Sequence, residues 1–141
     1  MAVLDAKGRD VVTIPANAPV LLALQEMESW DIGALVVTQH GREVVGVISE
    51  REIARGILHH GCHLLSLRAR EIMSTPVPVC RPDDSTNGCL ATMIWSGHRH
   101  LPVVGPRGPC GIVTVGDLLR YGVGDAAGAT GREAAVAGTL R

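Results

Sequence analysis

The chain has 141 residues, of which 46% are hydrophobic and 19% are charged, and this composition is typical of a globular protein. A formal net charge of −1 and an aromatic content of 2% argue against a nucleic-acid partner, which would require clustered cations and stacking rings. The sequence has no apolar run of about 20 residues and no signal peptide at its start, so we expect no membrane span and a cytoplasmic location. Four scattered cysteines agree with reduced thiols in that compartment.

The first half of the sequence alternates apolar runs with amphipathic stretches. A β-branched run at 11–14 predicts a strand, and the stretch 19–30 predicts a helix. Two further strands are predicted at 32–37 and 44–48 around a polar turn, followed by a helix at 50–60. The apolar positions at helical spacing in the first helix are Val20, Leu21, Leu24, Met27 and Trp30.

The same order of elements begins again after a connector at 62–73. Residues 77–79 predict a strand whose proline suits an edge position, and 82–85 predict a helix cap. Strands at 101–104 and 110–113 and a helix at 115–121 complete the second half. The helical face that follows the cap consists of Cys89, Leu90, Met93 and Ile94.

The two halves align residue by residue. Met27 corresponds to Met93 at an offset of 66 residues, and the offset falls to 65 at Gly46 and Gly111, because the second hairpin turn is shorter by one residue. The sequence therefore predicts a strand–helix–strand–strand–helix unit that occurs twice.

Each predicted unit ends its hairpin with the same short motif. Gly46-Val47-Ile48-Ser49 is followed by Glu52, and Gly111-Ile112-Val113-Thr114 is followed by Asp117. A hydroxyl and a carboxylate thus stand three residues apart where a strand runs into a helix. One interpretation is a ligand site that is used twice. The alternative is a plain N-cap, with a first-turn acid that the helix dipole favours.

The repeat resembles a tandem pair of cystathionine-β-synthase-type (CBS) domains, the Bateman module. The resemblance lies in residues 32–37 with 46–52, and in 98–103 with 111–117. The connector at 70–76 is similar to a phrase that opens many second repeats, and the likeness extends from Val3 to Tyr121. More narrowly, the chain is similar to small stand-alone bacterial CBS-pair proteins of signal transduction.

This resemblance implies an α/β (α+β) fold in which two β-α-β-β-α repeats pack about a pseudo-twofold axis. We expect a first repeat at 3–62, a connector at 63–76, a second repeat at 77–122 and a flexible tail at 123–141. Members of this family bind adenosine-containing ligands (AMP, ADP, ATP, NAD(H) or S-adenosylmethionine) in two clefts, and they usually form dimers. The resemblance therefore implies a non-catalytic regulatory module, a homodimer that senses adenine nucleotides and is read by an unknown effector protein.

The candidate ligand residues fall into three groups. A carboxylate can accept hydrogen bonds from both ribose hydroxyls, and the hydroxyl three residues earlier can assist; these residues are Thr114 with Asp117, and Ser49 with Glu52. The adenine requires an apolar slot, and its candidates are Val77, Val79, Leu101 and Pro102 in repeat two and Val11, Thr13, Ile32, Gly33 and Ala34 in repeat one. Phosphate requires cations, and the candidates are Arg99, His100, Arg51, Arg55 and Lys7. Because Glu52 replaces the usual Asp of the family, we expect the second site to bind better than the first.

Other interpretations remain open from the sequence alone. Arg99 and His100 would also suit a solvated basic edge. His59, His60, Cys62 and His63 resemble metal ligands, but they straddle a helix end, so we expect no metal there. No nucleophile–base pair or nucleotide-hydrolysing motif is present, so we expect no catalytic residues. The main functional alternative is a structural or dimerisation module whose ligand sites have degenerated.

Overall fold

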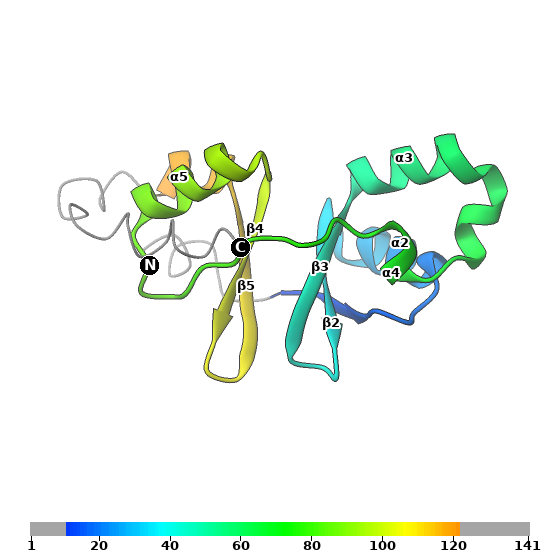
Figure 1. Cartoon of the computed structure of the whole chain (residues 1–141), viewed down its shortest axis with the longest axis horizontal. Helices are drawn as coiled ribbons and strands as arrows, with labels where there is room; N and C mark the ends of the chain where they lie inside the picture. The colour runs from blue at the N-terminus through cyan, green and yellow to red at the C-terminus, as the bar shows by residue number, and fades with distance from the viewer. Residues whose placement is uncertain (1–10, 122–141) are drawn as a thin grey trace. The chain divides into compact units, whose positions relative to one another are not determined.

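The structure, a computed structural model, describes residues 11–121 (Figure 1). The chain divides into two compact units. The N-terminal unit is Val12–Pro76, and the C-terminal unit comprises Val11 and, within the described range, residues 77–121. Each unit mixes helices with a small sheet, which confirms the predicted α+β class. The pseudo-twofold packing of the repeats stays a prediction, and the expected flexible tail lies outside the described residues.

The N-terminal unit is built on a three-stranded sheet in the order β1-β2-β3. Strand β1 (Thr13–Pro15) runs parallel to β2 (Ala34–Gln39), and helix α2 (Val20–Trp30) makes the crossover between them. Strand β3 (Glu43–Ser49) returns antiparallel to β2 and leads directly into α3 (Glu50–His60). The helices of this unit lie on one side of its hairpin (Figure 1). Side chains such as Ile14, Leu35 and Ile48, at most 2% exposed, form the core.

The predicted connector contains helices that the sequence analysis missed. It forms a 3-10 helix, η1 (Gly61–Ser66), and a short α4 (Ala69–Ile72). Leu64 and Ala69 are buried there, and the Ala69 N–H donates to the Ala18 carbonyl at 2.7 Å. Ser74 exchanges backbone hydrogen bonds with Val47, so the segment extends the β3 edge of the sheet. Single-turn helices of this kind leave no 3.6-residue periodicity to detect.

The C-terminal unit repeats the hairpin with the same irregularity. Strand β4 (His100–Gly105) pairs antiparallel with β5 (Gly108–Thr114), after helix α5 (Thr86–Ser96) and before α6 (Val115–Tyr121). The register shifts at Val37/Thr38 in the first hairpin and at Val103/Val104 in the second. Because these positions are equivalent, the duplication extends to the β-bulge.

The strand predicted at 77–79 is wrong. The segment makes only an isolated parallel bridge, from Cys80 to Val103, with the Cys80 N–H donating to the Pro102 carbonyl at 2.9 Å. Pro76 and Pro78 have no N–H to donate to a strand ladder, so regular pairing does not extend upstream of Cys80. The C-terminal sheet therefore has two strands among the described residues, whereas the N-terminal sheet has three.

The predicted helix faces are partly wrong. Helix α2 buries Val20, Ala23 and Met27, whereas Leu21 and Trp30 are exposed. The Trp30 indole N–H donates to Glu26 on the surface at 3.0 Å. Helix α5 buries Cys89 and Met93 as expected, but Ile94 is 73% exposed. In α5 the buried stripe includes small and hydroxyl residues that an apolar count overlooks: Thr86, Gly88 and Thr92.

Candidate functional site

In the N-terminal unit, the hydroxyl–acid motif is a closed cap at the start of α3. Ser49 is the N-cap residue, and Glu52 Oε1 accepts from both the Ser49 backbone N–H, at 2.9 Å, and its hydroxyl, at 2.7 Å. The Ser49 oxygen in turn accepts from the Arg51 N–H at 3.3 Å. The capping interpretation is confirmed here, and the Ser49 hydroxyl hydrogen is already bonded within the chain.

In the C-terminal unit, the equivalent motif forms a reciprocal pair. The Thr114 N–H donates to Asp117 Oδ2 at 2.9 Å, and the Asp117 N–H donates to Thr114 Oγ1 at 3.1 Å. Capping is therefore confirmed at α6 as well. The Thr114 hydroxyl oxygen acts here as an acceptor, and within the described residues no acceptor is bonded to its hydrogen. This hydroxyl has a proton to offer to a ligand, unlike that of Ser49.

The sheet registers give the residues that face each motif. Ala34 pairs with Ser49 across β2 and β3, and His100 pairs with Thr114 across β4 and β5. The structure therefore brings one phosphate candidate, His100, to the C-terminal motif, and Arg99 precedes it on the surface. In the N-terminal unit the equivalent positions are Gly33 and Ala34, neither of which carries a charge.

Glu50 covers the backbone at Gly33. A Cβ placed on Gly33 would lie 2.6 Å from Glu50 Oε1, and the Glu50 N–H donates to the Gly33 carbonyl at 3.1 Å. The space beside Gly33, a candidate residue of the adenine slot, is thus occupied by a carboxylate of the chain itself. Its equivalent in the C-terminal unit is Val115, which is uncharged.

The adenine-slot candidates lie in different surroundings. Leu101 is fully buried in the core of the C-terminal unit, so its side chain is committed to packing, and Pro102 is also buried. Val77 and Val79 are half-buried along the segment that precedes Cys80. Val79 lines a pocket of about 510 Å³ within the same unit, and the other lining residues are Arg81, Pro82, Asp83, Val104, Gly105 and Pro106.

The first-repeat candidates are also dispersed. Thr13 is exposed on β1, Ile32 packs against the core, and Ala34 is buried. Val11 is half-buried and belongs to the C-terminal unit rather than to the N-terminal one. Lys7 lies outside the described residues.

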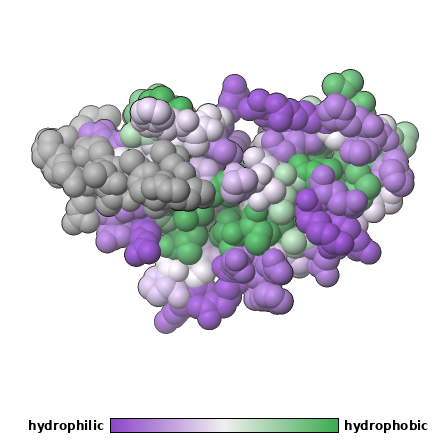
Figure 2. All heavy atoms as spheres, in the orientation of Figure 1, coloured by the Kyte–Doolittle hydropathy of each residue, from purple (hydrophilic) through white to green (hydrophobic). Residues whose placement is uncertain are grey.

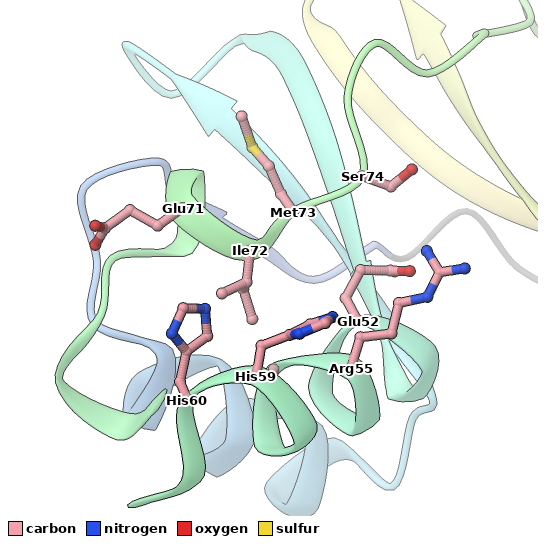
Figure 3. Close-up of a pocket in the computed structure, with 9 residues that line it drawn as sticks. Glu52, Arg55, His59, His60, Glu71, Ile72, Met73 and Ser74 are labelled. Atoms are coloured by element: carbon pink, nitrogen blue, oxygen red, sulfur yellow. The ribbon is translucent and has the colours of Figure 1, made fainter. Parts of the chain in front are cut away.

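A second pocket, of about 210 Å³, lies between α3 and the connector in the N-terminal unit (Figure 3). Glu52 and Arg55 extend from α3 toward Ser74, His59 and His60 face Ile72, and Glu71 points away from the others. The sequence analysis missed Glu71, Ile72, Met73 and Ser74 as pocket residues, because it treated this segment as a linker. Among residues 11–121, no three His, Cys, Asp or Glu side chains are grouped so as to hold a metal ion.

Apolar side chains remain exposed on the helices of both units. Figure 2 shows hydrophobic residues at the surface over α5 and over the end of α3. The residues are Leu21, Trp30, Ile57, Leu58 and Leu65 in the N-terminal unit and Ile94, Trp95 and Leu119 in the C-terminal unit. No helix in the described part of the chain has the length and apolarity to cross a membrane.

Comparison with known proteins identifies the class. Residues 5–59 and 69–124 each match the CBS domain. A CBS-domain-containing protein from Agrobacterium tumefaciens has a TM-score of 0.75 and 29% identity, with 84% of this chain and 89% of that chain covered. A CBS-domain protein from Burkholderia ambifaria MC40-6 also has a TM-score of 0.75, with 32% identity and coverage of 87% and 92%.

Curated relatives agree with this class. An uncharacterized protein of Methanopyrus kandleri is 31% identical over 121 residues, and the match covers 85% of this chain. The chain spans 62%, 66% and 50% of the lengths of the first three curated relatives. The chain belongs to the CBS-domain family. It contains a pair of CBS domains, the regulatory module that the duplicated motifs predicted.

Proposed function

We propose that this chain is a non-catalytic sensor of adenine nucleotides, with AMP, ADP, ATP or NAD(H) as its ligand. The observation that carries the proposal is the duplicated hydroxyl–acid motif, of which the C-terminal copy faces His100 and follows Arg99. A carboxylate, a hydroxyl and cations at one edge are the groups that a ribose phosphate requires. Membership of the CBS family supports the same conclusion.

Asp117 and Thr114 are the proposed ribose partners. Asp117 would accept from the ribose hydroxyls, and Thr114 would donate its remaining hydroxyl proton to the ribose or a phosphate oxygen. Arg99 would bind phosphate with a forked contact. Val77 and Val79 are the proposed apolar wall for the adenine, with the backbone of Leu101 and Pro102 beside them. In the N-terminal unit the proposed counterparts are Ser49, Glu52, Arg51 and Arg55 with Thr13, Ile32, Gly33 and Ala34, and Val11 and Lys7 complete the set.

A sensor requires two arrangements with unequal affinity for the ligand. We propose a homodimer in the cytoplasm, without a nucleic-acid or membrane partner, whose change in packing an effector protein reads. The exposed apolar residues on the helices, such as Trp95 and Leu119, support self-association. A related CBS-CP12 protein from bloom-forming cyanobacteria, 25% identical, is hexameric.

One observation favours a second candidate, a dimerisation module without a ligand. Both hydroxyl–acid pairs have local hydrogen-bonding roles, since they cap α3 and α6. Capping alone would account for these residue types at this spacing. The two candidates differ in whether the pairs also contact a nucleotide.

Thermal denaturation distinguishes them. A ligand that binds the folded chain at 100 times its Kd stabilises it by about 2.7 kcal/mol, which raises the midpoint by several degrees. We expect such a rise with at least one of AMP, ADP, ATP, NAD(H) and S-adenosylmethionine, and a smaller one for Asp117→Ala. If the chain forms dimers and millimolar ligand does not raise its unfolding midpoint, the dimerisation module is favoured.

A further inference from the structure

Helix α5 of the C-terminal unit carries no charged residue along its whole length. Its sequence, TNGCLATMIWS, contrasts with that of α2, VLLALQEMESW, which includes Glu26 and Glu28. Helix α5 buries one apolar side in its unit, and on the other side Ile94 and Trp95 are 73% and 80% exposed. A helix that is apolar all round is typical of one that is covered on every side. The outer side of α5 therefore has the composition of an interface, although it is open in the single chain.

The hydroxyl groups of α5 are satisfied within the helix. The Thr92 hydroxyl donates to the Gly88 carbonyl at 3.0 Å, and the Ser96 hydroxyl donates to the Thr92 carbonyl at 2.7 Å. Both hydroxyl hydrogens are thus bonded to the backbone one turn earlier. An apolar partner surface can cover these groups without leaving a buried donor unsatisfied, which would otherwise oppose association.

The N-terminal unit lacks this surface at the equivalent positions. Glu28 and Ser29 stand on α2 where Ile94 and Trp95 stand on α5, and both are exposed. If two copies met at this part of α2, the Glu28 carboxylates would be brought together, and like charges across an interface disfavour association. Of the two equivalent helices, α5 is therefore the one suited to contact its own copy.

Helix α3 also exposes apolar residues, but they lie among ionisable side chains. Ile57 and Leu58 are 58% and 81% exposed, and they stand between Arg55 and His59, which are exposed as well. The centre of a protein interface is depleted in charge and enriched in aromatic residues. Two copies that met at this surface would bring their Arg55 side chains together, so α3 suits self-association less than α5 does.

The size of the exposed surface on α5 fits a contact between two copies. At their exposed fractions, Ile94 and Trp95 offer about 300 Å² of apolar surface, the size of a functional patch on a monomer. Two copies would bury about 600 Å² from these side chains alone, and a specific interface buries about 1,200–2,000 Å² in total. Leu90 and Ala91, half-buried and one helical turn earlier, and Leu119, exposed on the neighbouring α6, add to this area.

We propose that two copies of this chain associate through α5 of the C-terminal unit, with Ile94 and Trp95 of each copy at the centre of a twofold contact. A twofold contact places the same surface on both copies, so it suits an uncharged face, which has no charge with which to select a different partner. Helices α2 and α3 lie outside the centre of this contact. The inference rests on the homodimer in the proposed function, and it adds the face through which the dimer forms.

The chain has two tryptophans, Trp30 on α2 and Trp95 on α5, and this allows the contact to be located. The full-length variant Trp30→Phe keeps Trp95 as its sole tryptophan. Sedimentation velocity and tryptophan fluorescence are measured together from low to high micromolar protein. We expect dimers to form as the concentration rises, and the Trp95 emission maximum to move to shorter wavelength with them.

The outcomes separate this inference from the rest of the proposed function. If dimers form and the Trp95 emission does not change, the contact lies elsewhere, which overturns the inference and leaves the homodimer intact. If the chain is a monomer at every concentration, the inference and the homodimer are both overturned. Nucleotide binding is measured separately by calorimetry, so it stands or falls independently of either result.

A matched pair of charged substitutions sharpens the test. Trp95→Glu should weaken self-association at least about tenfold, because the central aromatic side chain is lost and two carboxylates are brought together. Ser29→Glu places the same charge at the equivalent exposed position of α2 and should change the dissociation constant by less than about twofold. Both positions are exposed in the single chain, so both variants should fold, which circular dichroism checks. Equal effects of the two substitutions would overturn the assignment of the contact to α5.

Discussion

Glu50 and Gly33 form a contact that closes the end of the first hairpin. The Glu50 N–H donates to the Gly33 carbonyl at 3.1 Å, and its carboxylate fills the space that a Cβ on Gly33 would occupy. In the second hairpin the residue equivalent to Glu50 is Val115, which is uncharged, and the residue equivalent to Gly33 is Arg99, which is cationic. The equivalent edges of the two copies therefore differ at this position, with an acid over a glycine in one and an arginine in the other.

Gly46 should be intolerant of any side chain. A Cβ there would lie 2.6 Å from Met73 Sδ and 2.8 Å from the Ser74 carbonyl oxygen, and the latter is backbone that β3 holds in place. We expect Gly46→Ala to lower the free energy of unfolding by about 1–3 kcal/mol through overpacking. Urea denaturation provides the measurement.

Gly116→Ala is the matched control for this substitution. The nearest atom to a Cβ at Gly116 is Thr114 Oγ1 at 3.7 Å, an ordinary contact, and the residue lies in α6. Alanine should be neutral there or stabilise by up to about 1 kcal/mol. Equal losses for the two variants would contradict the contact between Gly46 and the connector.

Ser49→Ala should destabilise the N-terminal unit by about 0.5–2 kcal/mol, because α3 loses its capping side chain. Ser49→Thr keeps the hydroxyl and should recover most of this loss. Thermal or urea unfolding checks both variants. If Ser49→Ala unfolded at the same denaturant concentration as the unmodified chain, the hydrogen bonds between Ser49 and Glu52 would contribute nothing to the free energy of unfolding.

The hairpins and the duplication could be predicted because they leave local signals. Alternating β-branched runs placed the strands, and repeated Gly-to-acid spacing revealed the second copy together with both caps. The predicted class and family were correct for this reason. The motif in the sequence was compatible with capping and with ligand binding alike, and the structure shows the capping hydrogen bonds between Ser49 and Glu52 and between Thr114 and Asp117.

Features that depend on distant contacts could not be predicted in this way. The strand at 77–79 failed because prolines outweighed the propensity of its valines. Trp30 and Ile94 are exposed because neighbouring elements, and not helical periodicity alone, select which stripe is buried. The contact of Glu50 with Gly33 joins residues separated by a whole hairpin, so no local pattern indicates it.

The cysteines should differ in reactivity. Cys62 is exposed, whereas Cys80 and Cys89 are fully buried in the core of the C-terminal unit. With Ellman's reagent we expect the fastest-reacting thiol of the folded chain to be absent in Cys62→Ser, and the thiols of Cys80 and Cys89 to react when the protein unfolds. Fast reaction of Cys80 in the native state would contradict this core.

Stability should fall at alkaline pH. The hydrogen bond with the Cys89 thiol, followed by burial, raises the pKa of the Cys80 thiol far above its usual range. The unfolded chain ionises this thiol near its ordinary pKa of about 8.5, whereas the folded chain keeps it protonated. The contribution is therefore complete below that pH and declines above it, by up to about 1.4 kcal/mol per pH unit. Urea denaturation between about pH 8 and pH 10, a range that spans this pKa, measures the decline in the free energy of unfolding. Cys80→Ala should be less stable than the unmodified chain, and its free energy of unfolding should decline less steeply with pH. An equally steep decline in the two proteins would contradict this prediction.

The two acids should contribute unequally to nucleotide affinity. We expect Asp117→Ala to weaken AMP binding by at least about tenfold, because a charge-assisted contact with ribose is lost. Glu52→Ala should have a smaller effect, since Glu52 Oε1 accepts from the Ser49 hydroxyl as well as from the Ser49 N–H, and Glu50 lies two residues away in the sequence. Titration calorimetry of the two variants compares them directly. A larger loss for Glu52→Ala would reverse the ranking of the two copies.

The central claim is that the chain binds an adenine nucleotide. Isothermal titration calorimetry of the full chain with AMP, ATP and NAD(H) measures this without any reporter. We expect saturable heat with at least one of the three, and strong attenuation in Asp117→Ala. Absence of heat and of a thermal shift with every one of these nucleotides would contradict it.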